Sequence, residues 1–79
     1  ENSQPRFLSV LLKSGSDAVG KTLREIDLDE LEVEVNAVRR RNMHGAQPSG
    51  EMLLQAGDVL VLFGLPDALQ AAEVRLHKG

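Results

Sequence analysis

The sequence predicts a small α+β domain, in which a mostly antiparallel sheet packs against two helices in the order β-α-β-β-β-α. Its 79 residues suffice for one hydrophobic core and therefore for one domain. Apolar and polar residues alternate over residues 31–37, as in a strand with one buried face, and residues 59–63 form the continuous apolar run of a central strand. Apolar residues recur with helical spacing over residues 68–76. Together these patterns favour a sheet covered by helices.

The first part of the chain predicts a strand and a short helix. Residues 1–5 are polar and end in proline, as in a linker or disordered terminus before a single domain over residues 6–79. Residues 7–12 are apolar and partly β-branched, so we expect a buried strand. Thr22 and Glu25 have the spacing of a capping box, in which each side chain binds a free backbone N–H at a helix N-terminus.

A second strand is predicted over residues 31–40. Its alternation places Leu31, Val33 and Val35 on one face, but Val38 breaks the pattern, which either a β-bulge or a second buried surface explains. Polar residues and glycine over residues 41–45 predict a hairpin turn. Because proline donates no ladder hydrogen bond, residues 46–48 predict only a brief edge strand.

The last part predicts a tight turn, a central strand and a closing helix. Gly57 supplies a positive φ before the strand, and the Asp58 side chain is expected to cap the backbone N–H groups of that turn. Pro66 and Asp67 suit the first turn of a helix. The expected buried stripe of this helix comprises Ala68, Leu69, Ala72 and Leu76.

Composition excludes several classes of function. Lys and Arg number 9 and Asp and Glu 12, for a net charge of −3, which argues against broad electrostatic binding to nucleic acid or anionic lipid. The absence of cysteine excludes disulfides and thiolate metal sites. No apolar run approaches the roughly 20 residues that cross a bilayer. Since the chain begins with glutamate rather than methionine, we expect a soluble segment of a longer protein.

Residues 15–22 satisfy the pattern Gly-x-x-x-x-Gly-Lys-Thr of a phosphate-binding loop. Such a loop joins a buried parallel strand to a long helix in a far larger α/β domain. The helix predicted here is too short and the chain too small for a nucleoside triphosphatase, so we expect a fortuitous match. His44 and His77 lack a zinc-binding spacing, and no arrangement indicates a catalytic triad. We therefore expect neither catalysis nor a cofactor nor a metal.

Three arginines, Arg39 to Arg41, follow one another at the end of the second strand. Because side chains alternate along a strand, Arg39 and Arg41 are expected on one face and Arg40 on the other. Two interpretations stay open for them. Guanidinium groups bind anions such as phosphate well, but charged residues at strand ends are usually solvated or paired with acidic neighbours.

The order of these elements is similar to that of the C-terminal domain of the regulator-of-potassium-conductance type, also called the Trk-type C-terminal domain. The resemblance rests on residues 20–23, the strand end at residues 37–40, Pro48 and Gly64 before the closing helix. Its most specific part is the segment Leu-x-x-Gly-Asp-x-Leu over residues 54–60. It covers residues 7–78, nearly the whole chain.

The resemblance implies a regulatory module on the cytoplasmic side of the cell membrane. Domains of this type form homodimers, sense a small molecule or a cation, and act on a transmembrane transport domain of the same or a partner chain. They belong to bacterial potassium channels, uptake regulators and cation/proton antiporters. The expected function is therefore regulation of potassium or other monovalent cation transport, with an antiporter or transporter favoured. Neither catalysis nor nucleic-acid binding is implied.

The resemblance also nominates a ligand site at the dimer interface. In members that bind cyclic dinucleotides, the matching positions are Val35, Ala46 and Pro48, to which Arg39 adds an anion-binding group. The sequence departs from that subset at Glu34, where a carboxylate replaces a polar amide and repels phosphate. The alternative ligand is a divalent cation, because hard cations prefer oxygen ligands. Such ligands are offered by an acidic stretch comprising Asp27, Asp29, Glu30, Glu32 and Glu34.

Two alternative functions stay open. The chain is then either a purely structural dimerisation domain that binds no ligand, or a regulatory domain of a metabolic enzyme with a similar α+β architecture. If a small molecule stabilises the folded chain, the chain binds a ligand and is not a purely structural dimerisation domain. A catalytic domain encoded in the same gene, in place of transmembrane helices, favours the enzyme.

Overall fold

The computed structural model describes residues 4–40, 43–46 and 48–78. The elements follow the predicted order, with one added 3₁₀ helix, η1. They are β1 (Arg6–Leu11), α1 (Leu23–Ile26), η1 (Leu28–Leu31), β2 (Glu34–Arg40), β3 (Met43–Ala46), β4 (Val59–Gly64) and α2 (Pro66–Lys78). The predicted α+β class is confirmed. No helix in the described ranges has the length and apolar character that crossing a bilayer requires.

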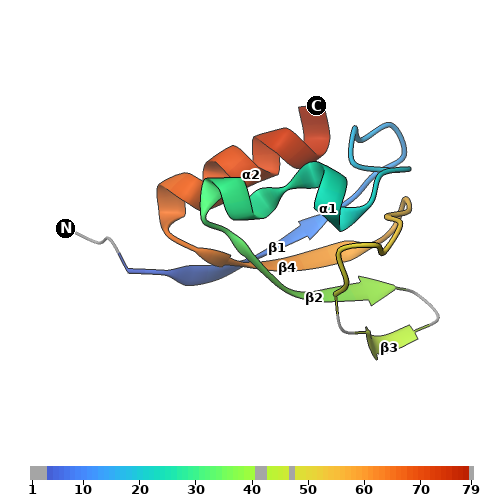
Figure 1. Cartoon of the computed structure of the whole chain (residues 1–79), viewed down its shortest axis with the longest axis horizontal. Helices are drawn as coiled ribbons and strands as arrows, with labels where there is room; N and C mark the ends of the chain where they lie inside the picture. Colours follow the sequence, from blue (N-terminus) through green and yellow to red (C-terminus); the bar gives the residue numbers. More distant parts are fainter. Residues whose placement is uncertain (1–3, 41–42, 47, 79) are drawn as a thin grey trace.

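The strands form one antiparallel sheet in the order β1-β4-β2-β3. The helices lie together over one face of this sheet (Figure 1). Between the layers lies an aliphatic core, whose fully buried side chains include Leu12, Leu54, Leu60, Leu62, Leu76, Val33 and Val38. We call the other side of the sheet the open face. By strand register it carries Phe7, Ser9, Leu11, Glu34, Ala37, Arg39, Val59, Val61 and Phe63.

A β-bulge in β2 resolves the break in its sequence pattern. Val35 pairs with Leu62, but Val38 pairs with Leu60, so β2 holds one more residue than β4 between these pairs. Leu60 and Leu62 both point into the core. The bulge therefore turns Val35 and Val38 toward the same, helix-covered face, and the first of the two explanations offered by the sequence is confirmed.

The predicted start of the second strand is wrong by three residues. Leu31 belongs to η1, and Glu32 ends this helix with a left-handed φ of 64°. The Glu32 N–H donates to the carbonyl oxygens of Leu28 and Asp29. Val33 is buried as predicted, but it precedes β2. The hydrogen bonds of the 3₁₀ helix thus determine the backbone conformation of residues 31 to 33. The alternation of apolar and polar residues indicates which side chains are buried, but it does not fix the backbone conformation.

The brief edge strand also lies earlier than predicted. It covers Met43–Ala46, because Arg40 pairs with Met43 and Val38 with Ala46 in a hairpin with β2. The predicted turn therefore includes residues that are strand, while Arg41 and Asn42 lie outside the described residues. Pro48 follows the strand instead of ending it, consistent with its missing N–H.

The strand predicted as buried over residues 7–12 is only half buried. β4 is central, as predicted, but β1 lies at one edge of the sheet. Val10 and Leu12 enter the core, whereas Phe7 and Leu11 remain 60% and 48% exposed on the open face. An apolar run predicts two buried faces, and within the described residues β1 buries one.

Both helices match their sequence signatures, and an arginine joins them. The Thr22 N–H donates to Glu25 Oε1 (2.8 Å), and the Glu25 N–H donates to Thr22 Oγ1 (3.2 Å), which is the predicted capping box. Leu69, Ala72 and Leu76 of α2 are buried as predicted. Arg75 of α2 is half buried; it donates to the carbonyl oxygens of Ile26 and Asp27 at the end of α1, and it pairs with Glu30.

An ion pair joins the end of β2 to the start of β4. Arg40 Nε donates to Asp58 Oδ1 (2.9 Å) and Arg40 Nη2 to Asp58 Oδ2 (2.8 Å), while Nη2 also donates to the Leu53 carbonyl. The Gln55 N–H donates to the same carboxylate, so the predicted turn cap at Asp58 is confirmed. Burial opposes ionisation of Asp58, but the hydrogen bonds from Arg40 and Gln55 and the arginine charge outweigh it and lower the pKa of Asp58.

Replacing Arg40 by alanine is expected to destabilise the fold strongly. The Asp58 side chain is nearly inaccessible, so Arg40→Ala leaves a buried carboxylate unpaired at a cost of about 2 to 4 kcal/mol. Arg39→Ala, at the adjacent exposed position, is the matched control and is expected to cost less than about 0.5 kcal/mol. Urea unfolding curves measure both, and equal losses for the two variants contradict the assignment.

The same pair makes stability depend on acid pH. Because the pKa of Asp58 is lowered in the folded state, its contribution is complete above the unfolded pKa of about 3.9 and is lost as pH falls through the folded value. The free energy of unfolding should therefore fall more steeply below about pH 4 in the parent chain than in Asp58→Asn. Parallel curves for the two proteins would show that Asp58 does not titrate in this way.

Glycine at position 32 is expected to stabilise the chain. A left-handed backbone conformation costs a residue with a side chain about 1 to 2 kcal/mol, and glycine avoids this cost. Glycine also increases the entropy of the unfolded chain, which offsets part of the gain in stability. We expect Glu32→Gly to raise the free energy of unfolding by about 0.5 to 1 kcal/mol. Glu34→Gly, in the extended strand β2, should lower it instead. The same change of sign in both variants would refute the conformational explanation.

Candidate functional site

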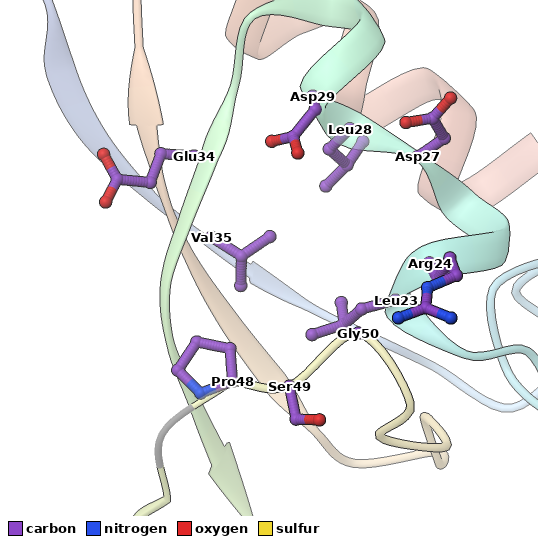
Figure 2. Close-up of a pocket in the computed structure, with 10 residues that line it drawn as sticks. All are labelled: Leu23, Arg24, Asp27, Leu28, Asp29, Glu34, Val35, Pro48, Ser49 and Gly50. Atoms are coloured by element: carbon purple, nitrogen blue, oxygen red, sulfur yellow. The ribbon is translucent and has the colours of Figure 1, made fainter.

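A hollow lies between α1, η1, β2 and the segment after Pro48. Its volume is about 310 Å³. Figure 2 shows the Val35 side chain pointing into the space between η1 and Pro48, with Arg24 and Gly50 at the opposite end. The lining residues are Leu23, Arg24, Asp27, Leu28, Asp29, Glu34, Val35, Pro48, Ser49 and Gly50. We call this hollow the Val35 pocket.

Backbone hydrogen bonds fix the walls of the Val35 pocket. The segment after Pro48 runs beside the start of α1: the Arg24 N–H donates to the Gly50 carbonyl (2.8 Å) and the Leu23 N–H to the Met52 carbonyl (3.2 Å). A Cβ at Gly50 would lie 3.4 Å from Arg24 Nε, so the glycine allows this close approach. The wall that carries Pro48 is therefore attached to the helix opposite.

The structure brings together two of the four site residues nominated from sequence. Val35 and Pro48 line the same pocket from β2 and from the following segment. Ala46 belongs to β3 and pairs with Val38, but its side chain lies outside the described part of the chain. Arg39 is exposed on the open face opposite Val59 and does not line the pocket. The binding role of all four remains a prediction.

The pocket has an apolar floor and a predominantly acidic rim. Leu23, Leu28 and Val35 supply aliphatic surface, while Asp27 and Asp29 approach from the helix side. Figure 2 shows the Glu34 carboxylate directed away from the centre, on the other side of β2. Arg24 is the basic lining residue. Carboxylates thus outnumber guanidinium groups, which disfavours polyanions and favours neutral or cationic ligands.

The phosphate-loop motif of residues 15–22 has the wrong structural context for binding a nucleotide. The strand before residues 15–22 is antiparallel to its neighbour, and α1 has 4 residues. Lys21 Nζ bonds to Asp17 Oδ2 at 2.6 Å, so the motif lysine is paired within its own loop. Within the described residues, no group of three or more His, Asp or Glu side chains is arranged to hold a metal ion.

Sequence reasoning missed the helical wall of the pocket. Leu23 and Arg24 lie in the predicted short helix, where no sequence pattern indicates ligand contact. Serine and glycine at positions 49 and 50 are typical of a turn, and this composition is the available signal that the chain reverses beside another element. Their contact with α1 joins segments distant in sequence, which local patterns do not report.

These features define a small α+β unit whose candidate site is a shallow pocket. A family model described as "TrkA-C domain" matches residues 7–77. The chain therefore belongs to the TrkA-C domain family, and the family recognised from sequence is confirmed.

A curated relative comes from Alkalimonas amylolytica and is named as a K(+) efflux antiporter, KefB. It is 38% identical to this chain over 73 residues, which cover 92% of this chain and 11% of the relative. The chain thus spans about a tenth of the length of the relative it matches. The similarity concerns one domain of a much longer protein.

Proposed function

We propose that this chain is the cytoplasmic regulatory domain of a bacterial potassium transport protein of the antiporter type. In this proposal the chain pairs with a second copy, binds a small ligand in the Val35 pocket and transmits the change to a transmembrane transport domain. The TrkA-C family membership and the similarity to a protein named as a K(+) efflux antiporter support the transport context.

The observation that carries the sensing role is the convergence of Val35 and Pro48 on one pocket. Val35 lies in β2 and Pro48 lies 13 positions later, after β3, yet both line the same hollow with α1 and η1. Its floor is apolar and its rim acidic, so we propose a neutral or cationic small molecule as the ligand class. A cyclic dinucleotide, with its phosphates, fits this rim poorly.

The pocket also has a structural connection to the sheet. Val35 lies beside the bulge of β2, and η1 ends four positions before Val35, whose side chain enters the hollow. A ligand that draws η1 and the Pro48 segment toward Val35 acts on the strand that leads to β3. We propose that this strand transmits ligand binding to the contact between copies.

A thermal-shift screen combined with light scattering tests the proposal. The probes are nucleotides, cyclic dinucleotides, dinucleotide cofactors and divalent cations. A ligand that binds only the folded chain stabilises it by about 2.7 kcal/mol at one hundred times its Kd, so we expect a saturable rise in Tm for one class. Val35→Asp should abolish this rise, whereas Ala37→Asp, on the open face of the same strand, should retain it.

The other outcomes separate the alternatives. A dimer that responds to none of the probes supports a purely structural dimerisation domain and overturns the sensing role. A monomer that responds to none of them overturns the proposed function as a whole. A response that Val35→Asp and Ala37→Asp affect equally removes the Val35 pocket from it.

A further inference from the structure

The free edge of β1 presents main-chain hydrogen-bonding groups to solvent. Leu12 binds the β4 side, because its N–H donates to the Asp58 carbonyl (2.8 Å) and its carbonyl accepts from the Gly57 N–H (2.7 Å). Hydrogen-bonding residues alternate along an antiparallel strand. The N–H and C=O groups of Phe7, Ser9 and Leu11 therefore point away from β4, and no strand within the described residues pairs with them.

Beyond its first residue, this edge lacks the features that prevent pairing with another strand. Natural edge strands are usually short, charged, bulged or interrupted by proline. β1 has 6 residues and pairs with β4 in unbroken register; Pro5 precedes it and Arg6 is its first residue, but neither charge nor proline occurs between Phe7 and Leu12. Phe7 and Leu11 are exposed large apolar side chains on the same face as Ser9. Both the backbone and the side chains of β1 are thus suited to a further strand.

We propose that β1 pairs antiparallel with β1 of a second copy, with Ser9 on the two-fold axis. In this register Ser9 faces Ser9 of the second copy, and Phe7 faces Leu11 of the second copy. Phe7, Ser9 and Leu11 of one copy then each face a residue of the second copy whose N–H and C=O groups also point to the free edge. The pairing satisfies their N–H and C=O groups and joins the two sheets into one.

The side chains of β1 are complementary to themselves in this register. On the open face, each Phe7 lies opposite a Leu11, an aromatic–aliphatic pair of the kind that stabilises neighbouring strands. On the helix-covered face, Leu8 lies opposite Val10. Arg6 lies opposite Leu12, so no like charges meet. A shift by two residues leaves one of the three outward-pointing residues of each copy without a partner.

This contact goes beyond the proposed function and does not depend on it. In the sheet order β1-β4-β2-β3, β1 lies at the edge opposite β3, and β2 with the Val35 pocket lies on the β3 side. A contact between copies at the pocket and a contact through β1 use different surfaces. Each can therefore be removed by a substitution that leaves the other intact.

Cysteine crosslinking tests the register directly, because the chain has no cysteine of its own. Directly opposite hydrogen-bonded residues have Cα atoms about 5.5 Å apart, within the range that a disulfide spans. We expect Ser9→Cys to form a covalent dimer under mild oxidation. Ser14→Cys, an exposed serine in the loop after β1, is the control and should remain largely monomeric on a denaturing gel.

Lysine substitution tests the contribution of the edge to assembly. We expect Phe7→Lys and Leu11→Lys each to reduce the Ser9→Cys crosslinking yield and, measured by light scattering, to remove the β1 contact. Val74→Lys, at a 54% exposed position on α2, is the matched control and should leave both unchanged. Thermal melting curves verify that each variant folds.

Failure of this proposal and failure of the proposed function give different results. If Ser9→Cys crosslinks no more than Ser14→Cys, the β1 contact is wrong, whatever the ligand screen shows. If Ser9→Cys crosslinks but no ligand raises Tm, the β1 contact stands and the sensing role does not. Crosslinking that persists in Phe7→Lys and Leu11→Lys overturns the proposed side-chain pairing.

Discussion

One extra residue in β2 determines which side chains reach the candidate site and which reach the core. Without the bulge, strict alternation places Val35 and Val38 on opposite faces of the sheet. With it, Val35 enters the pocket, Val38 enters the core, and Arg40 continues on the same face to meet Asp58. The placement of Val35, Val38 and Arg40 on one face of the sheet thus depends on a single local irregularity.

The ion pair and the capping interactions hold the remaining loops around this strand. Arg40 binds the Asp58 carboxylate and the Leu53 carbonyl, so the end of β2 contacts the segment that runs beside α1. Arg75 binds the end of α1 from α2. In a chain of 79 residues, where core burial is limited, such charge-assisted hydrogen bonds fix loops that apolar packing alone leaves free.

The sequence predicts the elements well because their signals are local. The capping box at Thr22, the buried stripe of α2 and the central strand β4 depend on neighbouring residues, and the structure contains all three. The start of β2 and the position of β3 were wrong, since a 3₁₀ turn and hairpin register decide them. For the candidate site, the family resemblance suggested Val35 and Pro48. The α1 wall remained unpredicted because it depends on contacts between distant segments.

The apolar sequence of β1 does not match the position of this strand at an edge of the sheet. Residues 59–63 and residues 7–12 are both apolar runs, which predict strands with two buried faces. Among the described residues, β4 has both neighbours, between β1 and β2, whereas β1 has one. The sequence of β1 therefore describes an environment that one copy of the chain does not supply. In the proposed pairing, a second β1 strand provides the missing neighbour and covers part of the exposed surface of Phe7 and Leu11, which accounts for the apolar character of an edge strand.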